Sequence, residues 1–315
     1  MNTWASLEGV FTANRADAYA ALARAFSAEP PLPDPLVVLH AVRWAALQGR
    51  AGDPWSGSPD DVRDDIARLR PEIEAALSRG LVQFTDPQRM TDLLPGLLLA
   101  ASRYPGLPLR LVELGSCAGL LLVPECYRIR YPRAHWSPGS AVVDLASELD
   151  VPPGLLDQRL EIVDRIGIDL APVDPSTGYD YLRAFTWPGD IAREPRLRAA
   201  LAAAALDPAP VLAGDVVELL PALLTERVAR DVVTVVIESA VSRYLGGGSI
   251  RRLGRMLDDA AGRGPVVLVS RTTPAANSRG LTSGVTVSDL YGRWRSAYAA
   301  TDALSEQVEW TGGWV

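Results

Sequence analysis

The chain has 315 residues, of which 48% are hydrophobic and 22% are charged, and its formal net charge is −7. This length and apolar content suffice for a complete α/β core with one smaller appended unit. Only two cysteines are present, so a disulfide framework is not expected. A negative net charge without a run of basic residues argues against nucleic acid as the main partner.

Neither a membrane span nor a signal peptide is visible in the sequence. No apolar run reaches the roughly 18 residues that a spanning helix needs. The first residues lack the basic stretch followed by an apolar stretch that marks a secretory signal. We therefore expect a cytoplasmic protein with no membrane partner, and the oligomeric state is left open.

The basic residues exclude several kinds of chemistry. All 31 of them are arginine, so the lysine of a Walker phosphate loop and the lysine of a Schiff base are both missing. His40 and His135 are the only histidines, which leaves little material for a Ser-His-Asp triad or a histidine-rich metal site. We expect no metal in the site.

Apolar residues recur at spacings of three and four through residues 1 to about 104, which predicts a helical amino-terminal part. The predicted helices cover Ala18–Phe26, Leu36–Leu47, Val62–Leu77 and Met90–Tyr104. Ser58 caps the third helix, Gly80 ends it, and Pro95 interrupts the fourth. Pro105-Gly106 then separates a helical subdomain, residues 1–106, from a second domain, residues 107–315.

From Leu109 onward, predicted strands alternate with predicted helices. The strands are Leu109–Leu114, Leu160–Leu170, Val211–Gly214, Val232–Glu238 and Val266–Ser270, with Val308–Trp310 as a last antiparallel strand. The helices are Tyr179–Ala184, Ile191–Leu206, Val216–Val228 and Ile250–Ala261, and Tyr131–Pro153 is a weakly periodic insertion. This alternation predicts an α/β fold with a doubly wound, mostly parallel sheet.

The end of the first predicted strand carries the strongest indication of a ligand site. Its apolar run ends in Glu113, and a loop with Gly115 and Gly119 follows. Glycine lets the chain turn sharply and lets backbone or ligand approach closely. This is the layout of the nucleotide-binding first βα turn at the carboxyl edge of a parallel sheet.

Carboxylates also follow the next three predicted strands, at Asp169, Asp215 and Glu238. The carboxyl ends of parallel strands line the ligand crevice, and a carboxylate there accepts hydrogen bonds from ribose hydroxyls or from an adenine amine. The glycine loop lacks the Gly-x-Gly-x-x-Gly spacing, and no lysine follows it. An adenosine-containing ligand without phosphates therefore fits better than NAD.

Three segments, Glu113–Gly119, Ile166–Asp169 and Ala213–Asp215, resemble the cofactor motifs of class I S-adenosylmethionine-dependent methyltransferases. The resemblance implies a methyltransferase-like Rossmann fold with S-adenosylmethionine as cofactor. The implied cofactor-binding residues are Glu113, Gly115, Ser116, Cys117, Gly119, Asp169, Asp215, Val216, Glu238 and Ser239. Two features depart from the pattern: Cys117 stands where the middle glycine is usual, and the gap from 119 to 169 is longer than one helix.

A second resemblance covers most of the chain. Its segments are Gly80–Gln83, Glu113–Leu120, Arg165–Asp174, Trp187–Leu197 and Val235–Leu245. They resemble a large bacterial family of unknown function, common in high-GC Gram-positive organisms, that joins a helical part to a methyltransferase-like domain. Phe84-Thr85-Asp86 replaces the family's Thr-Asn-Glu, Leu121 replaces an asparagine, and Glu125-Cys126-Tyr127 replaces Asp-Arg-Tyr. Either the substrate differs from that of other members or the activity has changed.

Five residues are candidates for catalysis and substrate contact: Gln83, Asp86, Trp187, Arg193 and Tyr244. An arginine and an aromatic ring suit a small acidic or amino-acid-like molecule, over which the helical part is expected to close. Each assignment has an ordinary alternative. A single strand-end acid is common at any protein surface, and Trp187–Arg193 also fits a helix start with a solvated arginine.

Three functions remain open from the sequence. The first is methyl transfer from S-adenosylmethionine to a small molecule, for which positioning supplies most of the acceleration. The second uses another carbon of the same cofactor, such as its aminocarboxypropyl group, in a cyclisation or elimination. The third is a non-catalytic binding protein that retains the fold.

Overall fold

The computed structural model describes residues 35–52, 59–79, 83–186, 192–272, 283–301 and 308–310. Contacts between Cα atoms divide the chain into two compact units. We call Met1–Phe84 with Thr177–Pro195 the helical unit, and Thr85–Ser176 with Arg196–Val315 the sheet unit. Three predictions from the sequence lie outside the described residues: the helix Ala18–Phe26, the helix cap at Ser58 and the helix end at Gly80.

The helical unit contains α2 (Pro35–Leu47), α3 (Pro59–Arg68), α4 (Arg70–Arg79), α7 (Tyr179–Arg183) and the first residues of α8 (Arg193–Ala204). Helix α2 packs against α4 and α7, with Val42, Ala45 and Ile73 almost completely buried. The predicted helix Val62–Leu77 is two helices that meet at Leu69. Pro71 is the second residue of α4 and fits a helix start there, because proline has no N–H to donate to the preceding turn and is tolerated only in the first turn of a helix.

The sheet unit is built on an eight-stranded sheet in the order β11-β10-β9-β8-β7-β1-β5-β6. Its strands are β1 (Leu109–Leu114), β5 (Ile162–Asp169), β6 (Val211–Ala213), β7 (Val233–Glu238), β8 (Val266–Thr272), β9 (Ser283–Asp289), β10 (Trp294–Thr301) and β11 (Val308–Trp310). Strands β6, β5, β1, β7 and β8 run parallel, and β9, β10 and β11 continue the sheet as an antiparallel meander. The predicted α/β class with a mostly parallel sheet is confirmed.

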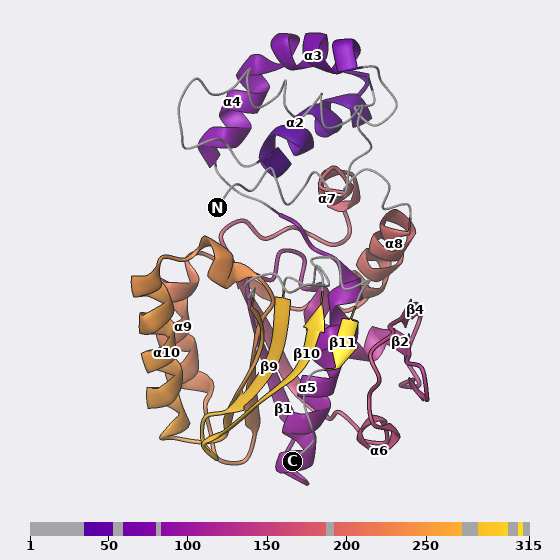
Figure 1. Ribbon diagram of the computed structural model, residues 1–315. Helices are drawn as coiled ribbons and strands as arrows, with labels where there is room; N and C mark the ends of the chain where they lie inside the picture. Colours follow the sequence, from indigo (N-terminus) through magenta and orange to yellow (C-terminus); the bar gives the residue numbers. More distant parts are fainter. Residues whose placement is uncertain are drawn as a thin grey trace. The chain divides into compact units, whose positions relative to one another are not determined.

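Helices pack on both faces of this sheet. Figure 1 shows α9 (Val216–Arg227) and α10 (Gly247–Ala261) side by side on one face and α5 (Met90–Arg103) on the other. Val112 and Leu114 of β1 belong to the core cluster with α9 and α10. Because side chains alternate along a strand, Glu113 points to the opposite face, on which α5 lies.

Helix α5 continues through Pro95, where the sequence predicted an interruption. Proline has no N–H to donate to the carbonyl four residues earlier, which is that of Thr91. The hydroxyl of Tyr131 donates to this carbonyl instead, at 2.8 Å. A side chain from outside the helix therefore satisfies the carbonyl that Pro95 leaves open.

The predicted insertion forms a second, small sheet. Its strands are β2 (Tyr127–Arg130), β3 (His135–Trp136) and β4 (Val143–Ala146) in the order β3-β2-β4, and α6 (Pro153–Leu156) follows. Only 3-10 turns, η2 (Leu120–Leu122) and η3 (Pro124–Cys126), separate the glycine loop from β2. No helix in the described part of the chain has the length and apolar character that a membrane crossing requires.

Candidate functional site

Strand order defines where a ligand site is expected. After β1 the chain adds β5 and β6 on one side and β7 and β8 on the other. The order therefore reverses between β1 and β7, and ligands of open α/β sheets bind outside the carboxyl ends of strands at such a point. Leu114 of β1 pairs with Ile168 of β5 and Glu238 of β7. The structure thus places the predicted residues at 113–119, 169 and 238–239 at one edge of the sheet.

The glycine loop after β1 is hydrogen-bonded to β5. The N–H groups of Gly115 and Ser116 both donate to the Ile168 carbonyl, at 2.8 and 3.2 Å. Gly115 and Gly119 have positive φ angles of 75° and 70°, a region that glycine enters without penalty. Cys117 also has a positive φ, 54°, which costs a side-chain-bearing residue about 1–2 kcal/mol. Surrounding contacts must therefore hold this loop in place.

Asp169 supplies one such contact. One carboxylate oxygen accepts from the Cys117 N–H at 2.8 Å, and the other accepts from the Ala171 N–H at 2.9 Å. The side chain is buried, with 8% of its surface exposed. The Asp169 carboxylate therefore holds the glycine loop beside the end of β5.

Gly167 allows the loop to lie close to β5. A Cβ atom at this position would lie 2.0 Å from Ser116 Oγ, far inside a van der Waals contact. Ser116 is itself buried, and its hydroxyl donates to the Glu113 carbonyl at 3.0 Å. The loop conformation therefore depends on an absent side chain at 167.

Glu113 is the most unusual group at this edge. It is only 2% exposed, and its Oε2 atom has no hydrogen-bond partner among the described residues. Burial, and secondarily the negative charge of Asp169, raise the pKa of Glu113 well above its usual range, while Arg89 acts in the opposite direction. A buried acceptor without a donor is costly, which is why such groups often mark a ligand position.

Arg89 is a residue that the sequence analysis missed. It ends η1 (Pro87–Arg89), the 3-10 turn before α5, and its Nη1 atom lies 3.4 Å from Ser239 Oγ. The guanidinium therefore lies beside the end of β7, and its positive charge lowers the pKa of Glu113 at the end of β1. The sequence around Arg89 does not distinguish it from the other 30 arginines. Its place beside the strand ends arises only when the chain folds.

Asp86 and Tyr127 are buried polar residues whose charges or dipoles act near Glu113, and Arg196 is a partly buried partner of Asp86. Asp86 caps η1 by accepting from the Gln88 N–H at 2.9 Å, and its other oxygen lies 3.4 Å from Arg196 Nη2. Tyr127 donates to the Leu120 carbonyl at 2.7 Å. Burial raises the pKa of Tyr127 well above its usual range, and the charges of Cys126, Glu113, Asp86 and Glu125 add to the effect.

Two other predicted acids have local structural partners. Glu238 accepts from the N–H groups of Ala240 and Ser242, both at 3.0 Å, and from the Ser270 hydroxyl at 2.7 Å. Asp215 caps α9 through the Val217 N–H at 2.7 Å. Val216, which follows Asp215, is buried in the core against α10.

The remaining candidates are distributed between the units. Gln83 and Arg193 belong to the helical unit, where the Arg193 guanidinium lies 3.9 Å from the Phe84 ring centroid and donates to the Phe185 carbonyl at 2.9 Å. Tyr244, at the end of η4 (Val241–Tyr244) in the sheet unit, is 58% exposed. Trp187 lies outside the described residues.

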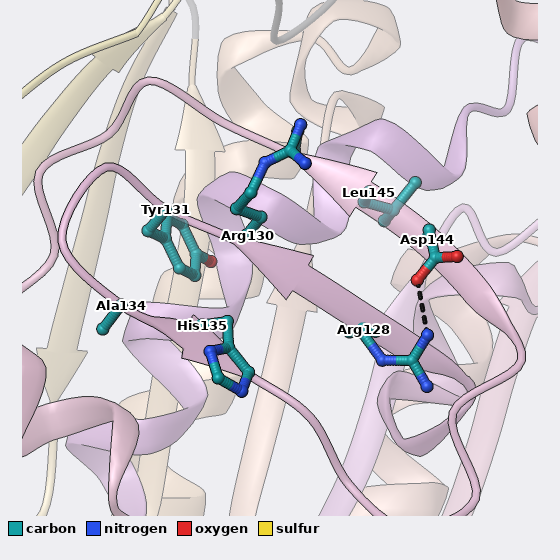
Figure 2. A pocket seen from close by; sticks show the side chains of 8 residues that line it. Arg128, Arg130, Tyr131, Ala134, His135, Asp144 and Leu145 are labelled. Atoms are coloured by element: carbon teal, nitrogen blue, oxygen red, sulfur yellow. Dashed lines mark hydrogen bonds and ion pairs between the residues drawn. The ribbon is translucent and has the colours of Figure 1, made fainter.

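A separate hollow of about 760 Å³ lies on the small sheet (Figure 2). Its lining residues are Arg128, Arg130, Tyr131, Ala134, His135, Asp144, Leu145 and Ala146. Arg128 donates to Asp144 at 2.8 Å, as Figure 2 shows. None of the residues predicted for cofactor or substrate lines this hollow, so the strand-end cluster remains the candidate site.

Comparison with known proteins gives a family. No curated protein matches the chain. A family model described as "Uncharacterized protein conserved in bacteria (DUF2332)" matches residues 48–310, which is most of the chain. The chain therefore belongs to this bacterial family.

Proposed function

We propose that the protein is an S-adenosylmethionine-dependent transferase that methylates a small molecule. The observation that supports this proposal most directly concerns Glu113, at the switch point between β1 and β7. Glu113 is a buried carboxylate, and one of its oxygens has no hydrogen-bond partner among the described residues. S-adenosylmethionine carries an ammonium and a sulfonium, and a cationic ligand compensates a buried carboxylate better than a neutral or anionic one. The cofactor would supply an electrophilic methyl group.

The backbone after the glycine loop also favours a ligand without phosphates. Phosphate groups are commonly held by the N-terminus of an α-helix that follows such a loop. Here two 3-10 turns of three residues each, η2 and η3, follow instead. Cationic side chains of lysine are absent from the whole chain.

The chain's own residues would position the ligand. We assign the ribose hydroxyls to the carboxylate of Asp169 at the end of β5 and the adenine amine to Asp215. Holding two reactants in line supplies most of the acceleration in a methyl transfer, and a base is needed only if the acceptor must lose a proton. Gln83, Asp86, Trp187, Arg193 and Tyr244 remain predictions for an acidic or amino-acid-like substrate.

One observation favours the non-catalytic alternative. Asp169 and Glu238 both accept hydrogen bonds from their own backbone surroundings, so each explains its position without a ligand. A protein that kept these acids only to hold its loops would retain the fold and bind no cofactor.

Isothermal titration with S-adenosylmethionine and S-adenosylhomocysteine separates these functions. Binding of both ligands supports the proposal, and no binding to folded protein contradicts it. Mass spectrometry of reactions with candidate acids and amino acids then distinguishes a methylated product from a cyclised or eliminated one. Asp174→Ala is the matched control, because this exposed acid accepts from the backbone N–H two residues further on, as Asp169 does from Ala171.

A further inference from the structure

The hollow on the small sheet owes its depth to the sequence of β2 and its neighbours. Exposed side chains alternate with buried ones along β2, so Arg128 and Arg130 stand on the outer face of the sheet. Ala134 and Ala146 also line the hollow, and their single methyl groups leave room beside the long arginine side chains. Its volume of about 760 Å³ is that of a small-molecule site.

Strand register gives the two arginines of β2 different neighbours. Arg128 is in register with Asp144 of β4 and donates to its carboxylate at 2.8 Å. Arg130 is in register with Ala146 of β4 on one side and with His135 of β3 on the other. Opposite charges on facing strands stabilise a sheet, so Arg128 has the usual arrangement and Arg130 does not.

Other acids of this segment do not compensate the charge of Arg130. Asp150 pairs with Arg133, and Glu148 lines a smaller hollow but not this one. Within the part of the chain that the structure describes, Arg130 forms no ion pair. With His135 neutral, the lining therefore retains one uncompensated positive charge, in a chain whose net charge is −7.

The Arg130 side chain is placed to meet a ligand in the hollow. Figure 2 shows it extending from the end of β2 and away from the pair of Arg128 and Asp144. Tyr131 and Leu145 lie on either side of it in this view. Both of these side chains are almost completely buried, so they form the floor of the hollow and the arginine stands above it.

We propose that this hollow binds a small organic anion, with the Arg130 guanidinium on its carboxylate or phosphate group. A guanidinium holds either oxyanion through two parallel hydrogen bonds. The apolar part of the ligand lies on Leu145, Ala134 and Ala146, because ligand pockets combine apolar walls with a few polar groups. His135, which is exposed on β3, offers a further hydrogen-bonding group at the rim. This site is separate from the strand-end cluster.

Isothermal titration of the full chain at low ionic strength tests the site with phenyl phosphate, benzoate, inorganic phosphate and benzyl alcohol. Wild type binds at least one of the two aromatic anions, and the tighter of them identifies the oxyanion. Inorganic phosphate binds more weakly, since it cannot contact the apolar floor, and benzyl alcohol does not bind, since it has no charge. Failure of both aromatic anions to bind overturns the proposal. Equal affinity for phenyl phosphate and inorganic phosphate, or for benzoate and benzyl alcohol, also overturns it.

Two substitutions remove the uncompensated charge in different ways. Arg130→Gln deletes it and weakens binding about tenfold, the loss expected for a charge-assisted hydrogen bond. Ala146→Asp keeps Arg130 but gives it the cross-strand acid that Arg128 already has, so binding is weakened in this variant as well. Arg133→Gln is the matched control, because Arg133 is an exposed arginine of the same segment that does not line the hollow.

Circular dichroism and thermal melting establish that each variant is folded. Wild-type affinity in folded Arg130→Gln overturns the proposal, and so does an equal weakening in Arg133→Gln, which would indicate a general effect of charge. Should Arg130→Gln fail to fold, Ala146→Asp decides the same question with the arginine in place. None of these titrations contains S-adenosylmethionine, so failure of the proposed function leaves their outcome unaffected.

Discussion

Glu113 and Asp169 are neighbouring carboxylates with opposite surroundings. Both oxygens of Asp169 accept backbone N–H groups, whereas Oε2 of Glu113 accepts nothing from the described residues. Hydrogen bonds to a carboxylate favour its ionised form, and burial without them favours the neutral form. Asp169 therefore holds a loop, whereas Glu113 has no such structural task and is, under the proposed function, the acid that faces the ligand.

Glu113→Gln should change how stability depends on pH. Folding raises the pKa of Glu113, so the stability that this group contributes is present below its unfolded pKa and is lost as pH rises through the folded pKa. Glutamine does not titrate, so the free energy of unfolding of the variant should rise relative to that of the wild type as pH increases above the usual range of a glutamate carboxyl group. Denaturant unfolding at increasing pH measures the difference, which should reach about 1–3 kcal/mol, the usual cost of an uncompensated buried group. A constant difference at all pH values would contradict the raised pKa.

Asp169→Ala should weaken S-adenosylmethionine binding by about 1–3 kcal/mol, since it removes both the proposed ribose acceptor and the clasp on the Cys117 N–H. Asp215→Ala should have a milder effect, because apolar contacts also hold adenine. Isothermal titration measures both, with Asp174→Ala as the control. Unchanged affinity in folded Asp169→Ala protein would remove the ribose assignment.

At the scale of single elements, Gly167 and Ser116 show how one strand shapes the loop of another. Gly167→Ala should destabilise the protein by about 1–3 kcal/mol, because the new methyl group overlaps the Ser116 side chain. Ser116→Gly removes the atoms that clash, so the double variant should recover much of the loss. Denaturant unfolding of the two single variants and the double variant gives the coupling. Additive losses would show that the clash lies elsewhere.

Pro95 and Tyr131 are a second pair whose effects on stability should be coupled, because both bear on the Thr91 carbonyl. Tyr131→Phe leaves the Thr91 carbonyl without its donor and should cost about 1–3 kcal/mol. In a Pro95→Ala background the helix supplies its own N–H to that carbonyl, so the same substitution should cost less. Tyr291→Phe, at a residue that is 47% exposed, controls for loss of a hydroxyl. Equal costs in both backgrounds would contradict this account.

These examples show what the sequence could predict and what it could not. Strands β1, β7 and β8 were predicted because buried parallel strands are continuous apolar runs bounded by turn residues, and β5 and the exposed edge strand β6 were predicted from shorter apolar runs that end before an acid. The continuation of α5 through Pro95 was missed because its donor, Tyr131, lies 36 residues beyond Pro95 in the chain. Arg89 was missed for the same reason: its role depends on β1 and β7, not on its neighbours. Strands β9 and β10 were also missed, although Val285 and Val287 show the alternation of a half-buried strand.

At the scale of the whole molecule, the proposed function makes a prediction about ligands that depends on the strand order and on the net charge of −7. The switch point gathers acids, no lysine is present, and no α-helix N-terminus follows the glycine loop. S-adenosylmethionine should therefore stabilise the folded protein where ATP, which shares its adenine and ribose, does not.

A ligand at about 100 times its dissociation constant stabilises the native state by about 2.7 kcal/mol, which raises Tm by several degrees. Thermal melting with each ligand, at equal concentration and ionic strength, measures the difference. Asp169→Ala should lose most of the rise with S-adenosylmethionine, and Asp174→Ala should keep it. A larger rise with ATP than with S-adenosylmethionine would mean that the glycine loop binds phosphate, and the adenosine ligand without phosphates would have to be abandoned.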